Sequence, residues 1–213
     1  MTPEAAAAAA ARPRVEGDRE QEILDAALEV LADCGYDRLT MDAVAHRAKA
    51  SKATLYRRWN SKATLVVEAL ARTKGVPVVP DTGDLRSDLL STFCGHGGLT
   101  DRDTTATLGA VLTAVSTDPE FAREFRGQFV QPRALVARTI FERARDRGEL
   151  RDDLDLDIVV PALAGIVLHR VFVLGDTPDP ALIERAVDQI ILPAVTPQYP
   201  RKSGSKESHV RPH

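Results

Sequence analysis

Apolar residues recur every three or four positions along most of the chain, which is the spacing of one face of an α-helix. Between residues 18 and 35 this apolar stripe consists of Ile23, Leu24, Ala27, Leu28, Leu31 and Cys34. No segment of the sequence sustains the alternation of apolar and polar residues that is typical of a half-buried β-strand. The pattern predicts an all-α protein of about nine helices.

Four helices are expected in the first third of the chain, at about residues 18–35, 41–48, 51–59 and 62–75. Gly35 is a natural C-terminal stop for the first of them. Thr40, Ser51 and Ser61 precede the other three, and a hydroxyl group there can accept a hydrogen bond from the first turn of the helix. A small N-terminal bundle is therefore predicted, with the fourth helix leading away from it.

The rest of the chain is expected to form a larger helical bundle, which begins after a Pro- and Gly-rich hinge at 75–84. Pro132 is expected to break the longest of its segments, because proline lacks an N–H group and its ring clashes with the preceding turn. The predicted segments lie at about 85–94, 101–116, 119–147, 155–174 and 180–194.

The chain divides into two expected domains, residues 17–74 and residues 75–196. The low-complexity N-terminus, 1–16, and the polar, mildly basic end, 197–213, are expected to be disordered tails. The longest nearly apolar stretch, 158–168, is too short to span a bilayer, so no association with a membrane is predicted.

The net charge of −3 conceals a strong asymmetry along the chain. Residues 38–74 hold nine Lys and Arg residues but only two acids, Asp42 and Glu68, whereas residues 75–196 hold twelve Arg residues and nineteen acids. Such a distribution indicates a region that faces a polyanion, carried on an otherwise acidic body.

The positive charge concentrates in the segment "SKATLYRRWNSK", residues 51–62, with Lys49 just before it. If the segment is wound as a helix, Leu55 and Trp59 fall on one side and can anchor it to a small core. Ala53, Thr54 and Arg57 point away from that side, Lys52 and Tyr56 lie on one flank, and Arg58 lies on the other. Small residues let a helix enter a DNA groove, while Arg, Lys and Thr can bind phosphates or base edges.

Two short helices joined by a three-residue turn, the second one basic, match the helix-turn-helix pattern. Residues 19–74 resemble the N-terminal DNA-binding domain of the TetR family of transcriptional repressors, through "ILDAALEVLADCGYDRLTMDAVAHRA" and "SKATLYRRWNSKATLVVEAL". Two departures stand out. Lys49-Ala50 replaces the usual Gly-Val of the turn, which costs roughly 1 kcal/mol if a positive φ is needed there, and Trp59 replaces the usual phenylalanine.

The resemblance implies which residues contact double-stranded DNA. Thr40 is expected to contact a phosphate, and the major groove is expected to be faced by Lys52, Ala53, Thr54 and Arg57. Tyr56 and Lys62 are expected to hold the DNA backbone with Arg58 close to it, Lys49 can add a contact, and Ser51 belongs to the same surface. No metal ion or cofactor is expected.

The resemblance also implies a C-terminal domain that dimerises through its last two long helices and binds a small-molecule effector. Broad apolar faces agree with this: Ile158, Val159, Leu163, Ile166, Val167 and Val171, then Leu182, Ile183, Val187, Ile190, Ile191 and Leu192. The alternative is that both faces are core. For the effector pocket the candidates are Phe125, Phe129, Arg133, His169 and Arg170, with a packed core and a hydrogen-bonded histidine as the alternative.

The predicted function is that of a cytoplasmic, sequence-specific transcriptional regulator, a repressor that binds a palindromic operator as a homodimer and is released by its effector. The alternative is a helical small-molecule-binding or interaction protein that does not bind DNA. Enzymatic activity is not predicted, because the sequence has no glycine-rich phosphate loop, GxSxG or HExxH motif. Cys34 and Cys94 lack the spacing of metal ligands and indicate buried thiols in a reducing compartment.

Overall fold

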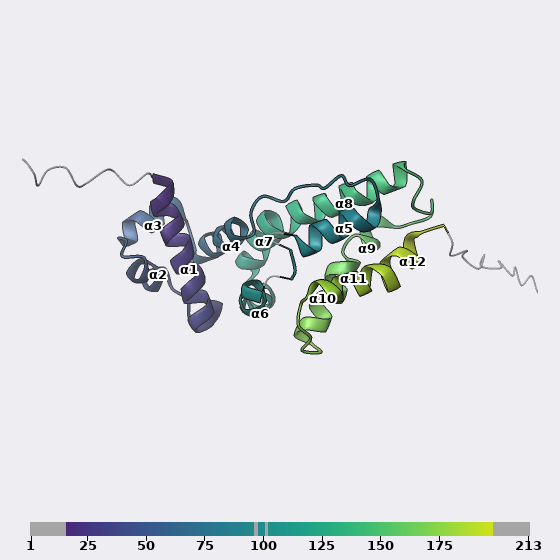
Figure 1. The fold of residues 1–213 in the computed structure, drawn as a ribbon. Helices are drawn as coiled ribbons and strands as arrows, with labels where there is room; N and C mark the ends of the chain where they lie inside the picture. The colour runs from purple at the N-terminus through teal and green to yellow at the C-terminus, as the bar shows by residue number, and fades with distance from the viewer. Residues whose placement is uncertain (1–15, 96–97, 101, 198–213) are drawn as a thin grey trace, which may run out of the picture.

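The computed structural model of the protein describes residues 16–95, 98–100 and 102–197, and every regular element within these ranges is helical. The elements are twelve α-helices and two π-helical turns, which confirms the all-α prediction for the described residues. Figure 1 shows an elongated molecule with the first three helices at one end and the last three at the other. The two expected tails fall almost entirely on residues 1–15 and 198–213, outside the described ranges.

The N-terminal helices are α1 (Glu16–Arg38), α2 (Met41–Arg47), α3 (Lys52–Arg58) and α4 (Lys62–Thr73). Gly35 has a φ of 74° and ends the regular part of α1, as a residue without a β-carbon can. Thr40, Ser51 and Ser61 each accept a hydrogen bond from the backbone N–H three residues later. All three expected N-caps are therefore confirmed.

The N-terminal helices share one hydrophobic core, to which α3 contributes its inward side. Leu55 and Trp59 are 0% and 2% exposed, and Leu39 and Val44 meet them in the same core. Burial of such a side chain stabilises the fold by about 1.5–3 kcal/mol. This packing fixes which side of α3 faces solvent.

The C-terminal part consists of the elements α5 (Leu85–Cys94), α6 (Arg102–Thr117), α7 (Pro119–Phe125), η2 (Arg126–Val130), α8 (Gln131–Asp146), α9 (Leu156–Val159), α10 (Ala162–Phe172), α11 (Pro180–Ala186), η3 (Val187–Ile191) and α12 (Leu192–Val195). Two of them, η2 and η3, are single π-helical turns inside longer helices. Within the described ranges, no helix is long and apolar enough to cross a bilayer.

Pro132 does not break its helix, contrary to the prediction. It lies in the first turn of α8, and the π-turn η2 precedes it, with the N–H of Gln131 bonded to the carbonyl of Arg126 five residues earlier. The wider turn accommodates a proline ring that would otherwise clash with the preceding turn of an α-helix. The π-turn η3 stands in the same relation to Pro193 of α12.

Pro161 interrupts the segment for which the sequence pattern predicts one helix over 155–174. The chain forms a turn at Val160 and Pro161, which separates α9 from α10. Pro161 has a φ of −79° and a ψ of −7°, away from the helical average. The apolar periodicity continues across this point, and for that reason it does not reveal the interruption.

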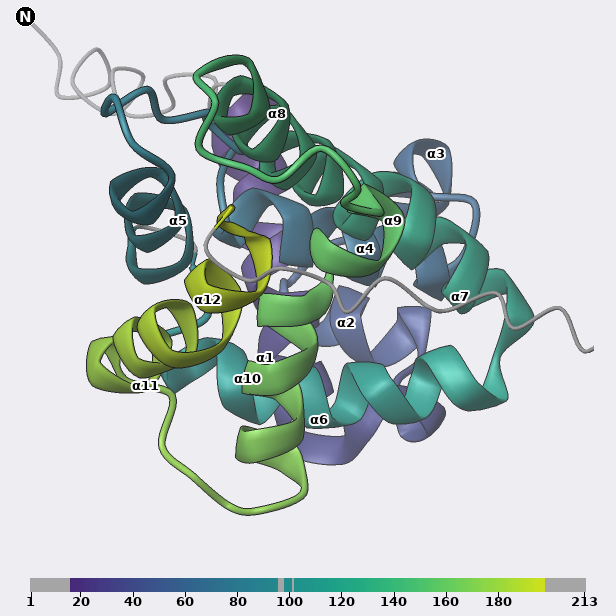
Figure 2. The same ribbon diagram turned by 90° about the vertical axis from the view of Figure 1, so that its right-hand side faces the viewer.

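Two separate hydrophobic cores are present. The first joins α1–α4 to Val111 and Ala114 of α6 and to Phe121 and Phe125 of α7. The second is built from α5, α8 and the helices from α9 to α12. Figure 2 shows α10, α11 and α12 in front, with the N-terminal helices behind. The helices α6 and α7 therefore pack with the N-terminal unit, although they follow residue 74.

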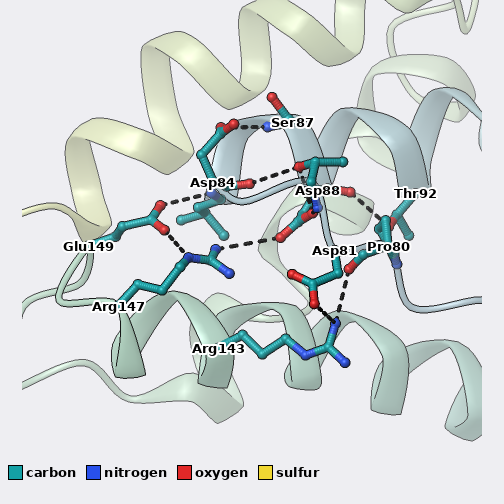
Figure 3. Close-up of polar contacts among 11 residues, drawn as sticks. Pro80, Asp81, Asp84, Ser87, Asp88, Thr92, Arg143, Arg147 and Glu149 are labelled. Carbon is teal, nitrogen blue, oxygen red and sulfur yellow. Dashed lines mark hydrogen bonds and ion pairs between the residues drawn. The ribbon is translucent and has the colours of Figure 1, made fainter.

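A buried carboxylate, that of Asp88 in α5, holds the linker that follows α4. Asp88 is fully buried and accepts hydrogen bonds at 2.7 Å from both the N–H and the hydroxyl of Thr82. Arg147 lies 3.5 Å from the same carboxylate and also pairs with Glu149, so that positive charge offsets the buried negative charge. Figure 3 shows Asp88 and Arg147 pointing toward one another.

Candidate nucleic-acid interface

The outward side of α3 and its flanks present most of the residues that are expected to contact DNA. Exposed members of this set are Thr40, Lys49, Ser51, Lys52, Ala53, Tyr56, Arg57 and Arg58, whereas Thr54 and Lys62 are half-buried. Tyr56 is 52% exposed, a large fraction for an aromatic side chain. The structure thus exposes eight of the ten residues at one end of the molecule, with Thr54 half-buried among them, and Lys62 is held differently.

Hydroxyl groups at the start of α2 and α3 are already used as caps. Thr40 accepts from the N–H of Ala43 at 3.1 Å, and Ser51 accepts from the N–H of Thr54 at 3.1 Å. The hydroxyl groups of Ser51 and Thr54 also lie 2.8 Å apart. A capping hydroxyl accepts a hydrogen bond through its oxygen, so the proton of Thr40 stays available for a phosphate.

The turn between α2 and α3 contains a lysine in the left-handed region. Lys49 has a φ of 50°, and it is the one positive-φ residue other than glycine in the described part of the chain. The N–H of Ala50 bonds to the carbonyl of Ala45 at 2.9 Å, which is the bond pattern of a Schellman helix end. The condition left open by the sequence is therefore met, because the turn places Lys49 at a positive φ.

Arg19, which the sequence reasoning missed, fastens this turn to α1. Its Nη2 donates to the carbonyl oxygen of Lys49 at 2.6 Å, and its Nη1 pairs with Glu22. The bond joins residues thirty positions apart, so no local pattern could have revealed it. It holds the turn that sets where α3 begins.

The surface is less free of acids than the sequence suggests, because two of the expected cations have acidic partners within the protein. Lys52 pairs with Asp42 of α2. Arg58 pairs with Glu20 at 2.8 Å and with Glu68 at 3.0 Å. Arg57, by contrast, has no ion pair or side-chain hydrogen bond with any residue in the described ranges.

Glu68 of α4 is the second residue that the sequence reasoning missed. One of its carboxylate oxygens accepts from Nε1 of Trp59 at 2.8 Å, and the other from Nη2 of Arg58 at 3.0 Å. Arg72 lies 3.3 Å from the same carboxylate and 3.4 Å from that of Glu20. A signal was present in the sequence, because a buried tryptophan in place of phenylalanine needs an acceptor for its N–H.

Lys62, at the start of α4, is held by the end of α1 in this structure. Its Nζ donates to the carbonyl oxygens of Tyr36 at 3.0 Å and Leu39 at 3.4 Å, and it lies 4.2 Å from the centre of the Tyr36 ring. Tyr36 lies in the last turn of α1 and Leu39 just beyond it, and the Tyr36 carbonyl also accepts from the N–H of Leu39 at 3.2 Å. The expected phosphate contact of Lys62 stays a prediction, and it would require the ammonium group to leave these partners.

Tyr36 also joins the N-terminal unit to α7. Its hydroxyl donates to Asp118, which caps α7, at 3.0 Å, and its ring lies 4.4 Å from that of Phe121. Burial, and after it the hydrogen bond with Asp118, raises the pKa of the Tyr36 hydroxyl above its ordinary value. The hydrogen bonds from the first turn of α7 hold the pKa of Asp118 below its usual range, with a further contribution from Tyr36.

The five candidate effector residues do not form one cluster of contacts. Phe125, Phe129 and Arg133 form a row, with ring centres 4.9 Å apart and the Arg133 guanidinium 3.9 Å from the centre of the Phe129 ring. Phe125 is buried in the first core, and its expected contact with an effector stays a prediction. His169 is exposed on α10, and Arg170 pairs with Asp176 in the following loop.

Neither of two hollows on the described surface is lined by a candidate effector residue. One, of about 380 Å³, lies beside the α2–α3 turn and is lined by residues that include Arg19, Glu22 and Lys49. The other, of about 230 Å³, lies between α8 and α9 near Arg138 and Asp157. In the described ranges no group of three His, Cys, Asp or Glu residues is placed to hold a metal ion.

A capped pair of short helices on a small core, with a basic and exposed second helix, defines a helix-turn-helix DNA-binding protein. Comparison with known families agrees. Residues 23–69 match the model described as bacterial regulatory proteins of the tetR family, and residues 79–190 match the tetracyclin repressor-like C-terminal domain. The chain belongs to the TetR family of transcriptional regulators.

Individual relatives support this assignment over most of the chain. An HTH-type transcriptional regulator of Mycobacterium tuberculosis is 40% identical over 84% of this chain and 88% of its own length. The DNA-binding transcriptional repressor TetR of Mycobacteroides abscessus is 34% identical over 84% of this chain and 95% of its own length. The crystal structure of the TetR family regulator SCO0332 superposes with a TM-score of 0.65 at 30% identity, covering 84% of this chain and all of that one. The protein is thus a DNA-binding transcriptional regulator, and the alternative of a helical protein that does not bind DNA is disfavoured.

Proposed function

We propose that the protein is a repressor that binds a palindromic operator as a homodimer and is released by a small-molecule effector. The observation that carries the proposal is the outward side of α3, where Arg57 and Tyr56 are exposed and have no hydrogen-bond or ion-pair partner among the described residues, while Leu55 and Trp59 are buried behind them. Arginine can bond both major-groove acceptors of guanine, and a tyrosine hydroxyl can hold a phosphate. Ala53, small and exposed, lets this side of the helix approach the base pairs.

Lys52 takes a phosphate in this proposal by exchanging its acidic partner. Lys52 and Asp42 are both more than half exposed, and such a pair is worth only about 0–1 kcal/mol in water. A DNA phosphate can therefore replace Asp42 at little cost. Arg58 is held by two carboxylates, and its proposed place is beside the DNA backbone rather than on a base.

A second copy of the chain is the proposed partner of the C-terminal helices. Much of the expected apolar face is buried within the protomer, namely Leu163, Val167, Leu182, Ile183, Val187 and Ile191. Other apolar residues of these helices stay exposed: Ile158 at 70%, Val173 at 69% and Ile190 at 49%. Gly165 of α10 is exposed and has open space where a β-carbon would stand, which suits close helix approach. These features support dimerisation by a two-fold axis, which also suits two half-sites on DNA.

The proposed effector region is the row formed by Phe125, Phe129 and Arg133, which runs from α7 through η2 to the start of α8. Nη2 of Arg133 donates to the carbonyl oxygen of Gly75, just after α4, at 3.4 Å, and Nη1 donates to that of Phe129 at 3.1 Å. Burial lowers the pKa of Arg133 from its ordinary value. In the proposal, a ligand that draws Arg133 away from Gly75 loosens the end of α4. His169 and Arg170, on α10, are proposed as further contacts of the ligand.

The proposed place of action is the cytoplasm, together with the DNA that the protein regulates. The proposal assigns no catalytic step, cofactor or metal ion to the chain. Release of DNA follows from a shift between two conformations that differ in the distance between the two α3 helices of the dimer.

The decisive experiment is selection of bound sequences from a pool of random DNA duplexes, followed by titration of the selected duplex at several salt concentrations. The expected result is an inverted repeat with half-sites about 10 base pairs apart or a multiple of that. Affinity for it should fall steeply with salt, because several phosphates are neutralised by Lys and Arg. Enrichment of no sequence, or binding that ignores salt, would rule the proposal out.

A further inference from the structure

The end of the recognition helix α3 is attached to α4 by a single carboxylate, that of Glu68. Its two oxygens accept from Nε1 of Trp59 at 2.8 Å and from Nη2 of Arg58 at 3.0 Å. Trp59 and Arg58 are neighbours at the end of α3, so one acid on α4 holds two consecutive residues from two directions. Two hydrogen bonds in different directions restrict rotation as well as translation of a helix end.

The bond to Trp59 is one that the fold requires. Trp59 is 2% exposed, and a buried indole N–H without an acceptor costs about 1–3 kcal/mol. Glu68 supplies that acceptor. A phenylalanine at this position would fill the core without needing any acceptor, so the tryptophan makes the contact with α4 polar and directional.

The same carboxylate organises the charges behind α3. Arg72 of α4 pairs with both Glu68 and Glu20. The carboxylate of Glu20 also accepts a hydrogen bond from Nε of Arg58 at 2.8 Å. Two acids and two arginines thus join α1, α3 and α4 in one network. Within residues 38–74 Glu68 is one of only two acids, and the other, Asp42, pairs with Lys52 at the opposite end of α3.

The helix α4 leads from this network to the rest of the protein. It packs against α1, α7 and η2, and the carbonyl oxygen of Gly75, just beyond its end, accepts from Arg133. A displacement of α4 therefore moves Glu68, and Glu68 moves Trp59 and Arg58. The carboxylate lies on the route from the proposed effector region to the DNA-reading helix.

We propose that Glu68 is a positioning residue for DNA recognition, which sets the orientation of α3 through Trp59 and Arg58 and passes movements of α4 to it. The inference rests on the proposed function, in which α3 reads an operator. Glu68 also withholds the charges of Arg58 and Arg72 from DNA. Its removal should therefore have two opposite effects, poorer discrimination between sequences and stronger attraction to any duplex.

The test compares the parent protein with Glu68→Ala, Trp59→Phe and the double variant on the selected operator and on an unrelated duplex. For Glu68→Ala we expect the ratio of the two affinities to fall by about tenfold. The affinity for the unrelated duplex should stay equal or rise. Trp59→Phe removes the N–H that needs an acceptor. The double variant should therefore have a higher affinity ratio than Glu68→Ala alone, because the effects of residues in contact are not additive.

Trp59 is the single tryptophan of the chain and reports on the contact without DNA. In Glu68→Ala we expect a shift of its emission and easier quenching by acrylamide, with unchanged helix content by circular dichroism. Asp42→Asn is the matched control, because it removes the other acid of residues 38–74 and should leave the Trp59 emission unchanged.

Two outcomes would overturn the proposal for Glu68. One is unchanged Trp59 emission and quenching in Glu68→Ala, and the other is an unchanged affinity ratio, which includes the equal weakening on both duplexes that simple unfolding would cause. Failure of the proposed function is a different result, since the parent protein itself would then show no preference for the selected duplex. The fluorescence measurement tests the Trp59–Glu68 contact whether or not the parent protein prefers the selected duplex.

Discussion

The hydroxyl of Tyr36 donates a hydrogen bond to Oδ2 of Asp118, 3.0 Å away, and so ties the end of α1 to the first turn of α7. The Tyr36 ring packs against Phe121 on one part of its surface and receives the ammonium group of Lys62 at 4.2 Å from its centre. The N-terminal unit and α7 are therefore joined by apolar, polar and cation–π contacts around one side chain.

Tyr36→Phe should remove the hydrogen bond and keep the ring contacts. We expect a loss of about 1–2 kcal/mol in the free energy of unfolding at neutral pH. The pKa of Tyr36 is raised in the folded state, so its contribution is complete below the ordinary value of 10.0 and is lost as pH rises beyond that value. Urea unfolding at pH 8 and at pH 11 measures how much the free energy of unfolding falls between the two pH values. This fall should be smaller for the variant than for the parent.

Tyr56→Phe is the control for this measurement, because the hydroxyl of Tyr56 has no partner within the described ranges. Its free energy of unfolding should stay within about 0.5 kcal/mol of the parent at both pH values. Equal alkaline loss in the parent and in Tyr36→Phe would show that the Tyr36–Asp118 bond does not contribute as described.

The strained turn at Lys49 gives a second prediction. Lys49→Gly removes the cost of a β-carbon at a φ of 50°, and Lys49→Ala keeps that cost. Both variants lose the same positive charge. We expect Lys49→Gly to be more stable than Lys49→Ala by about 1 kcal/mol in chemical denaturation, while both bind any duplex more weakly and with a smaller salt dependence. Equal stability of the two variants would contradict the conformational argument.

The N-terminal unit could be predicted in detail because its determinants are local. The caps at Thr40, Ser51 and Ser61 act over three residues, and the spacing of Leu55 and Trp59 identifies the inward side of α3. The sequence also pointed to the turn at Lys49 as the place where a glycine is missing, and the structure shows a positive φ there. In each case the residue and its partner lie within one or two helical turns of each other.

Contacts between distant residues could not be predicted in the same way. The bond of Tyr36 to Asp118 spans 82 positions, and the sequence offers many acids as candidates. The helical wheel places Arg58 on the outside of α3 but could not show that its guanidinium is paired with Glu68. In the C-terminal part, periodicity located the helices but could not show how a π-turn accommodates Pro132 or that His169 is exposed on α10.

Arg57 and Tyr56 should affect DNA binding in different ways. Arg57→Ala should relax discrimination at particular base pairs by about 1–3 kcal/mol, because its guanidinium is free to read base edges. Tyr56→Phe should weaken binding to all duplexes alike, since a phosphate contact carries no sequence information. Competition binding with single base-pair variants of the selected operator distinguishes the two patterns. Parent-like behaviour of both variants would show that the assigned side of α3 does not face DNA.

Asp88 should be the most sensitive acid of the C-terminal part. Asp88→Ala leaves the N–H of Thr82 without its acceptor and removes the shorter of the two hydrogen bonds of the Thr82 hydroxyl, while Arg147 keeps its pair with Glu149. We expect a loss of about 2–3 kcal/mol in the free energy of unfolding. Asp81→Ala is the control, because Asp81 is exposed and lies 3.7 Å from Arg143, so its loss should cost less than about 1 kcal/mol. Similar midpoints of urea unfolding for the two variants would contradict this assignment.

The proposed dimer predicts that substitution of one exposed apolar residue disturbs dimerisation and that substitution of another does not. Ile190 is 49% exposed on η3, within the face assigned to a second copy, and Leu135 is 63% exposed on α8, outside it. A buried, unpaired carboxylate is strongly unfavourable, so Ile190→Glu should shift the protein toward monomer in sedimentation velocity and weaken operator binding. Leu135→Glu should leave the mass and the operator affinity unchanged. Since both side chains are exposed in the protomer, neither substitution should unfold it, and a dimer that tolerates Ile190→Glu would place the interface on another face.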